Sequence, residues 1–260
     1  APGSRNSSSA RLATVSRWHR RLRLVSLALI GLLPDFLKRP AYRILFGYRI
    51  GSGVSIGLSL LDAQQVDLAE GTHIGHFNLI LRVGHLQAAP HARVGLCNII
   101  RGGERVSLGA YSTVMRFNVL NAIPDHDCTT HPVSILELGD GATVVSGHRV
   151  DFTDQVRIGR NVILGGRNSS LWTHNRQETG PITIEDFCYL GSEIRIAPGA
   201  RLPSECILAM GSVLTGKIDQ PRSLVAGVPA KAVRALTEED LARVRFKTRS
   251  DIPNDFYNRP

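Results

Sequence analysis

A large aliphatic residue recurs at every sixth position through the C-terminal part of the chain. The residue two places before each aliphatic is small or apolar, so buried positions are expected in pairs. A helix would give a period near 3.6 and a plain strand a period of two, so this step predicts a short strand and a corner that repeat. The longest uninterrupted series is Ile184, Leu190, Ile196, Leu202, Leu208 and Leu214.

Shorter runs with the same step, between residues 50 and 164, extend the pattern over most of the chain. A chain that repeats a strand and a corner forms a parallel β-solenoid, in which each coil pairs with the backbone of the coil before it. Corners favour small and turn-forming residues, because the backbone bends there. The step slips by two residues at Val106–Leu108 and at Val156–Ile158, where we expect bulged corners or loops.

The repeat resembles that of the hexapeptide-repeat acyltransferases over roughly residues 50–235. This resemblance implies an all-β fold, a left-handed parallel β-helix of triangular cross-section with three hexads per coil. Residues 18 apart would then stack, with Leu190 beneath Leu208 and Cys188 beneath Cys206, at the strand spacing of about 4.8 Å. The segment LLPDFLKRPAYRILFGYRIGSGVSIG more loosely resembles the lead-in of acetyltransferases that modify bacterial surface polysaccharides.

The segment between Ser170 and Ile184 interrupts the step of six. It covers 14 residues where two hexads would need 12, so it should project from the coil as a loop. Loops on a rigid scaffold are a common location for functional residues. The loop carries His174 in the sequence WTHNRQETGPITI, and Trp172 lies at its base.

The resemblance implies that His174 is a catalytic base, because acetyltransferases of the family have a histidine in this place, before a return to the coil similar to GPITI. Transfer of an acetyl group from a thioester to a hydroxyl or an amine requires removal of a proton from the attacking group. An imidazole with a pKa near 6.5 can accept that proton at neutral pH. The alternative interpretation of a lone histidine is a polar loop residue without a chemical role.

The resemblance also implies contacts with acetyl-CoA as co-substrate. The segment VAGVPAKAVR, residues 225–234, is similar to a closing motif of the family, whose basic residues lie near the 3′-phosphate of coenzyme A. A capping turn with solvated charges is the alternative for this motif. Met210 stands where the family has a small residue and would narrow the groove for the pantetheine arm. The implied coenzyme-binding residues are Ser192, Met210, Thr215, Lys231 and Arg234.

Other histidines leave alternatives open. The spacing of His91, His126 and His131 is similar to that of the zinc ligands in solenoid carbonic anhydrases of the gamma class, which implies a zinc lyase as an alternative function. The arginine–aspartate pair of that class is not evident, so we expect no bound metal. His148 could be a buried core histidine or could line the acceptor site. The candidate acceptor-binding residues are Trp172, His148 and Asp151.

The positive charge is concentrated in the N-terminal segment. The formal net charge is +9, and residues 1–50 hold ten Lys or Arg and one acidic residue. Residues 1–10 are small and polar and are expected to be disordered or an expression remnant. Residues 11–49 predict a basic arm of two amphipathic helices broken at Pro34 and Pro40. Its ten-residue apolar run is too short to span a bilayer, so it should lie on a membrane surface or pack on the body or a neighbouring subunit.

Residues 236–260 should add a short C-terminal helix, Glu238–Lys247 capped by Thr237, and a tail. Four cysteines without a CxxC pair indicate a reducing, cytoplasmic setting. We therefore expect an acetyl-CoA-dependent O-acetyltransferase that modifies a sugar of a surface glycan or its precursor, at or near the inner face of the cytoplasmic membrane. N-acetyl transfer to an amino sugar and a non-catalytic scaffold remain alternatives. The resemblance implies a homotrimer, and the uneven charge disfavours nucleic acid as a partner.

Overall fold

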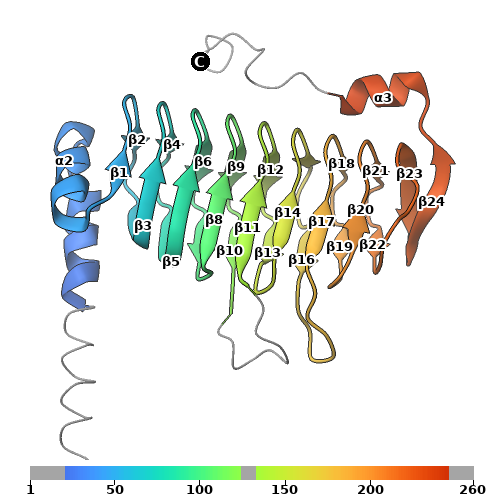
Figure 1. The fold of residues 1–260 in the computed structure, drawn as a ribbon, viewed down its shortest axis with the longest axis horizontal. Helices are drawn as coiled ribbons and strands as arrows, with labels where there is room; N and C mark the ends of the chain where they lie inside the picture. Colours follow the sequence, from blue (N-terminus) through green and yellow to red (C-terminus); the bar gives the residue numbers. More distant parts are fainter. Residues whose placement is uncertain (1–20, 124–132, 246–260) are drawn as a thin grey trace, which may run out of the picture.

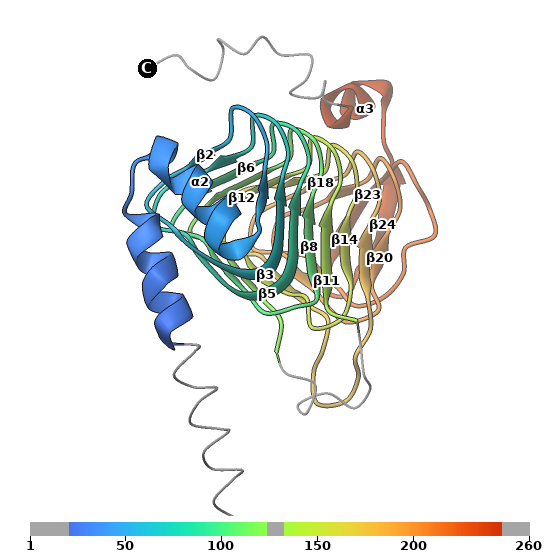
Figure 2. The ribbon, with the colours of Figure 1, turned by 60° about the vertical axis from the view of Figure 1, so that its left-hand side comes forward.

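A parallel β-solenoid forms most of the molecule in the computed structural model, which describes residues 21–123 and 133–245. The coils stack into a column of about eight turns (Figure 1). Each turn contributes short strands to three faces, and Figure 2 shows the turns nested around a common interior. The solenoid expected from the step of six is confirmed.

Parallel pairing between successive turns defines the faces. The first face contains β1 (Arg49–Ile50), β8 (Arg105–Leu108), β11 (Ile135–Leu138), β14 (Val156–Ile158), β17 (Ile182–Ile184) and β20 (Arg201–Leu202). The second contains β2 (Ser55–Ile56), β4 (His73–Ile74), β6 (Arg93–Leu96), β9 (Thr113–Arg116), β12 (Thr143–Ser146), β15 (Ile163–Leu164), β18 (Tyr189–Leu190), β21 (Ile207–Leu208) and β23 (Ser223–Gly227). The third contains β7 (Ile99–Arg101), β10 (Val119–Asn121), β13 (Arg149–Asp151), β16 (Ser170–Trp172), β19 (Arg195–Ile196) and β22 (Val213–Leu214).

Three further strands complete the column. The strands β3 (Leu60–Leu68) and β5 (Leu79–Ala88) each turn a corner, so they belong to both the third and the first face. The strand β24 (Ala230–Ala235) pairs antiparallel with β23 and closes the C-terminal end.

Residues of successive turns stack in register through the interior. Leu190 pairs with Leu208, as a coil of 18 residues predicts. An earlier turn is 20 residues long, because Ile74 pairs with Val94. Since the strands themselves keep the register, the additional residues must lie in the corners.

The bulges expected at Val106–Leu108 and Val156–Ile158 are wrong, because both segments are regular strands with both aliphatic side chains buried. Before β8, the chain turns through Gly102 and Gly103, whose φ angles of 75° and 81° favour glycine. A Cβ on Gly103 would approach the ring of Phe152 to 2.3 Å, so the corner is also closely packed. The step slips because the preceding corner is longer.

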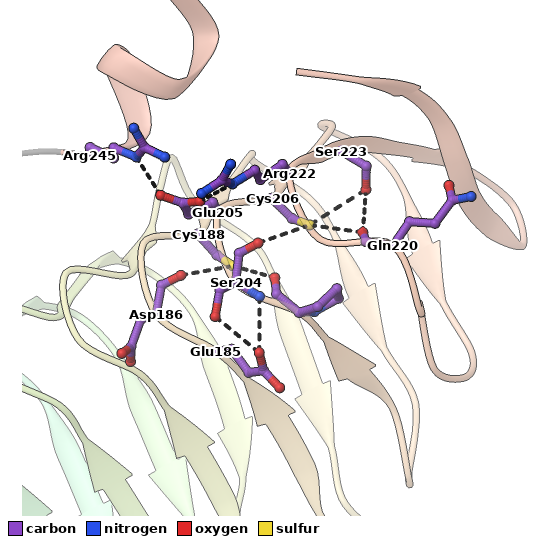
Figure 3. Close-up of polar contacts among 11 residues, drawn as sticks. Glu185, Asp186, Cys188, Ser204, Glu205, Cys206, Gln220, Arg222, Ser223 and Arg245 are labelled. Carbon is purple, nitrogen blue, oxygen red and sulfur yellow. Dashed lines mark hydrogen bonds and ion pairs between the residues drawn. The ribbon is translucent and has the colours of Figure 1, made fainter. Parts of the chain in front are cut away.

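Two cysteines occupy equivalent positions in successive turns near the C-terminal end (Figure 3). The Cys188 thiol lies 3.1 Å from the carbonyl oxygen of Pro203, and the Cys206 thiol lies 3.5 Å from the hydroxyl of Ser223. Burial raises the pKa of both thiols. These cysteines are therefore inert core residues, as the stacking of residues 18 apart predicts.

Two helices, residues 21–31 and α2 (Asp35–Phe46), cover the N-terminal end of the column (Figure 1). The break at Pro34 is confirmed, but the break expected at Pro40 is wrong, because Pro40 lies inside α2. Proline removes one helix hydrogen bond, yet the buried Lys38 and Tyr42 on either side of it anchor the helix to the column.

A short helix, α3 (Glu238–Val244), follows the column, as the sequence predicts. Thr237 caps it, because its hydroxyl accepts a hydrogen bond from the backbone N–H of Asp240 (3.2 Å). Residues 1–10, the first part of the basic arm and the C-terminal tail lie outside the described residues.

Candidate active site

The expected loop between β16 and β17 projects from the column (Figure 1). It is a small hairpin, in which His174 forms an antiparallel bridge with Thr179. The side-chain oxygen of Asn175 accepts hydrogen bonds from the backbone N–H groups of Gln177 (2.7 Å) and Glu178 (2.8 Å) and so fixes the tip. His174 therefore lies at the base of an ordered loop, where the chain leaves the column.

The imidazole of His174 faces the carboxylate of Asp151, which lies one turn earlier at the end of β13. Nδ1 of His174 hydrogen-bonds Oδ2 of Asp151. A carboxylate only accepts, so the proton is on Nδ1 and the lone pair is on Nε2. The His174 side chain is 18% exposed and that of Asp151 only 4%. A buried carboxylate thus orients a histidine that solvent can still reach.

Asp151 is buried, but both of its carboxylate oxygens have partners. Oδ1 accepts hydrogen bonds from the backbone N–H (3.1 Å) and the hydroxyl (2.6 Å) of Thr153. Oδ2 accepts a hydrogen bond from the hydroxyl of Thr173 (3.3 Å), which itself accepts one from the N–H of Asp154 (3.0 Å). Buried charges are stable only with such partners. This network fixes the carboxylate and, through it, the imidazole.

A cavity of about 180 Å³ lies beside this pair on the third face. His174, Asp151 and Trp172 line it, so the structure brings together three of the residues chosen from the sequence. Trp172 is partly exposed, so its indole is available to a ligand. The arrangement offers a histidine nitrogen, an aromatic surface and a small enclosed volume.

The sequence analysis missed two polar residues of this cavity, Arg149 and Asn121. Asn121 pairs with Asp151, and Asp151 pairs with Trp172, so these outward side chains stack from turn to turn. Arg149 is exposed and lies two residues before Asp151 on the same strand. Their alignment with Asp151 and Trp172 was the available signal, but it requires the coil lengths.

A larger and more open groove of about 1260 Å³ runs along the first face, past Asp67, Ser107 and Glu137. None of the residues that match the family motifs lines this groove. We therefore place the candidate site at the smaller cavity, where the projecting loop and the carboxylate–histidine pair meet.

His148 lies away from this cavity, in a buried ladder of side-chain amides. Oδ1 of Asn98 accepts hydrogen bonds from the backbone N–H (3.0 Å) and the side-chain amide (3.1 Å) of Asn118. Oδ1 of Asn118 accepts from the backbone N–H of His148 (2.9 Å), and Nδ1 of His148 accepts from the N–H of Ser169 (3.3 Å). Burial lowers the pKa of His148 to about 4. His148 thus occupies the next rung of the ladder as a neutral histidine.

The residues implied to bind the coenzyme lie near the C-terminal end of the column. Ser192 and Met210 occupy successive corners between the second and third faces, and the carbonyl of Ser192 accepts a hydrogen bond from the N–H of Gly211 (3.0 Å). The Met210 side chain is exposed. Thr215 lies on the other side of β22, at the corner that corresponds to the loop of His174.

The two basic residues of the closing motif both lie on β24. Lys231 is exposed. Arg234 donates hydrogen bonds to the carboxylate of Asp240 (2.7 Å) and to the carbonyl of Ala235 (2.9 Å). The Arg234 guanidinium lowers the pKa of Asp240 to about 2. A phosphate would therefore compete with Asp240 for Arg234, whereas Lys231 is accessible.

The histidines suggested as zinc ligands are not brought together by anything the structure describes. His126 and His131 lie outside the described residues. His91 stacks on the ring of Tyr111, with ring centroids 4.9 Å apart. Within residues 21–123 and 133–245, no cluster of three or more His, Cys, Asp or Glu side chains could hold a metal ion.

The sequence comparisons identify acetyltransferases as relatives. No family model matches the chain. A galactoside O-acetyltransferase of Escherichia coli K12 is 30% identical over 103 residues, which is 38% of this chain and 50% of the relative. A second relative, from Saccharomyces cerevisiae and also named an acetyltransferase, is 31% identical over 129 residues, 48% of this chain and 61% of the relative. The chain thus spans between half and two thirds of the length of these relatives.

Similar solved structures come from the same class. A hexapeptide transferase family protein from Anaplasma phagocytophilum is 22% identical and covers 61% of this chain and 89% of that chain, with a TM-score of 0.45. A hexapeptide-repeat acetyltransferase from Vibrio cholerae, complexed with acetyl coenzyme A, is 16% identical and covers 82% of this chain and 87% of that chain, with a TM-score of 0.32.

The solenoid and the acetyltransferase relatives fit the hexapeptide-repeat acyltransferase family, which confirms the resemblance seen in the sequence. Across the part of the chain that the structure describes, no helix is long and apolar enough to cross a bilayer.

Proposed function

We propose that the protein is an acetyl-CoA-dependent acetyltransferase that transfers the acetyl group to a hydroxyl of a sugar, with His174 as general base. The observation that carries this proposal is the pairing of Nδ1 of His174 with the buried Asp151 beside a cavity. The relatives named acetyltransferases, one of them a galactoside O-acetyltransferase, support the reaction class and a sugar acceptor.

The step requires one proton to move as one bond forms and another breaks. The acceptor oxygen attacks the carbonyl carbon of the thioester while Nε2 of His174 takes the hydroxyl proton. The carbon–sulfur bond then breaks, and the proton passes from His174 to the departing thiolate. Asp151 remains a carboxylate and stabilises the transient imidazolium, so it is a positioning residue.

The coenzyme would lie along the third face near its C-terminal end. Ser192 and Met210 border that face on one side and Thr215 on the other, so these residues could follow the pantetheine arm towards His174. Lys231, with Arg234 if it leaves Asp240, would supply positive charge for the 3′-phosphate.

The acceptor would occupy the cavity beside His174. A partly exposed indole such as Trp172 suits the apolar face of a sugar ring, and Arg149 and Asn121 supply donors for hydroxyl groups. We further propose the surface glycan or its precursor as the source of this sugar, a cytoplasmic location and a homotrimeric assembly. The apolar side chains exposed along the edge of the third face, including Phe77, Ile99 and Phe117, support assembly.

The test is transfer from acetyl-CoA to a panel of galactosides and other sugars, measured as thiol release and as acetylated product by mass spectrometry. His174→Ala should lower turnover about 10²–10⁴-fold. His85→Ala is a matched control, because His85 also pairs with a carboxylate, Asp67 (2.6 Å), with similar exposure but on the first face. Equal turnover in His174→Ala and His85→Ala would remove the base assignment.

The same product distinguishes O-transfer from N-transfer. Neutral hydroxylamine cleaves an acetyl ester but not an amide, so loss of the added acetyl group on treatment identifies a hydroxyl acceptor. Retention of the acetyl group on an amino sugar would instead identify N-acetyl transfer.

A further inference from the structure

The two N-terminal helices turn several of their basic side chains inward. Nζ of Lys38 donates hydrogen bonds to the carbonyl oxygens of Ile56 (2.7 Å) and Gly57 (2.9 Å) in the first coil. Arg43 donates to the carbonyl oxygen of Ile50 in the same coil. The first coil has no preceding turn to pair with, so its backbone groups need other partners. The basic side chains of the helices supply them.

The same orientation holds at the other end of the helical segment. The Arg23 guanidinium pairs with the carboxylate of Asp62 (3.0 Å) and donates to the carbonyl oxygen of Ala63 (2.7 Å). Asp35, the only acidic residue among residues 1–50, accepts a hydrogen bond from the N–H of Ile56 (3.2 Å). The acidic charge of this segment is therefore also directed toward the column.

The opposite face of the helices is apolar and has no cover among the described residues. In a helix that packs only on its own protein, the apolar stripe faces inward and the polar residues face water. Here Leu27, Ile30 and Tyr42 do face inward, but eight other large apolar side chains are between 46% and 80% exposed. We call this surface the N-terminal outer face: Leu22, Val25, Leu29, Leu32, Phe36, Leu37, Ile44 and Leu45.

The charge of this end selects among partners. Residues 1–50 carry ten basic residues and a single acid, and the rest of the chain is neutral, so the whole net charge of +9 belongs to this segment. A second copy docked face to face would bring two such charges together, which is unfavourable. An anionic lipid surface complements both the charge and the aliphatic side chains.

We propose that the N-terminal outer face docks in the plane of an anionic membrane surface and does not span it. Figure 1 shows the helices at one end of the column, so docking would place the solenoid on the membrane by that end. The cavity beside His174 lies on a side of the column, on β10, β13 and β16, and would stay open to solvent and to acceptors near the bilayer. This inference is independent of the chemistry proposed for His174.

The test is flotation of the full chain with phosphatidylcholine vesicles and with vesicles that contain about one third phosphatidylglycerol, at about 0.1 M salt. We expect binding to the anionic vesicles, weakened by about 1 M salt because the screening length falls from about 10 Å to about 3 Å. Replacement of two exposed apolar side chains, in Leu32→Gln/Phe36→Gln, should lower the affinity for anionic vesicles about 10-fold or more.

A matched control removes two equally exposed apolar side chains elsewhere. Phe77 and Phe117 are 64% and 61% exposed on the column itself, and Phe77→Gln/Phe117→Gln should leave vesicle binding unchanged. Failure of the full chain to bind anionic vesicles, or an equal loss of binding in both double variants, would overturn the proposal. A change of oligomeric mass in Leu32→Gln/Phe36→Gln, without vesicle binding by the parent chain, would assign the face to another copy instead.

Discussion

The pairing between Asp151 and His174 makes Asp151→Asn an informative substitution. The amide is nearly the same size, and its oxygen can still accept the two hydrogen bonds from Thr153. The position of Oδ2 would instead hold an NH₂ group, which donates and cannot accept. Nδ1 of His174 must then accept, so the ring proton moves to Nε2. The nitrogen that should take the proton of the acceptor is blocked.

The size of the effect follows from this change of tautomer. The corresponding Asp-to-Asn change in proteases with a Ser-His-Asp triad lowers kcat by about 10⁴. General base catalysis contributes about 10²–10⁴. We therefore expect Asp151→Asn to lower kcat by about 10²–10⁴, equivalent to about 3–5 kcal/mol of transition-state stabilisation. The Michaelis constants should change little, because the Asp151 side chain is almost fully buried behind the histidine.

The assay is thiol release with saturating acetyl-CoA and acceptor, together with a urea unfolding curve for each variant. The matched control is Asp67→Asn, which also loses the carboxylate partner of a histidine, His85, but on the first face. Asp67→Asn should keep its kcat. The reasoning is refuted if folded Asp151→Asn retains kcat within about threefold, since the orientation of His174 would then not depend on the carboxylate.

Three further substitutions test other parts of the structure. The pKa of His148 is lowered to about 4, below the value of about 6.5 expected in the unfolded chain, so the folded state binds fewer protons in this range. Its stabilising contribution is complete above pH 6.5 and is lost as pH falls to 4, about 3 kcal/mol in all, and His148→Asn should remove this pH dependence in urea unfolding by extending the amide ladder. Lys38→Met should lower the free energy of unfolding by about 1–3 kcal/mol, because two carbonyl oxygens of the first coil lose their donor; no loss in urea unfolding would contradict that capping role. Met210→Ala should lower the KM for acetyl-CoA without changing the melting temperature beyond a degree or two, since this side chain is exposed; an unchanged KM would show that it does not narrow the groove.

The fold could be predicted from the sequence because the solenoid repeats one local rule. Each pair of inward aliphatics specifies a strand, and stacking then follows from pairing with the next turn, as at Leu190 and Leu208. The slip at Val106–Leu108 was located correctly but explained wrongly. A period detects how many residues separate two strands, but it does not tell whether the extra residues lie in the strand or in the corner.

The site was predictable only in part, for a related reason. His174 was found because its loop breaks the period. Asp151 was chosen as an acceptor contact, whereas the structure places it behind the histidine. That contact joins residues 23 positions apart, and the coil length between them exceeds the ideal 18 because the loop is inserted. The outward apolar residues of the helices were missed for another reason. An amphipathic pattern shows that a helix has two faces, but it does not show which of them meets the column.

The amide ladder and the Asp151–His174 contact both cross from one turn to the next, so competence is a property of neighbouring turns that have zipped together. In a column whose turns contact only their neighbours, fraying from the C-terminal end can open the last turns while the first ones stay closed. The protein should therefore lose activity on heating before it loses most of its β signal in circular dichroism, because the chain from residue 170 onward carries half of the pair.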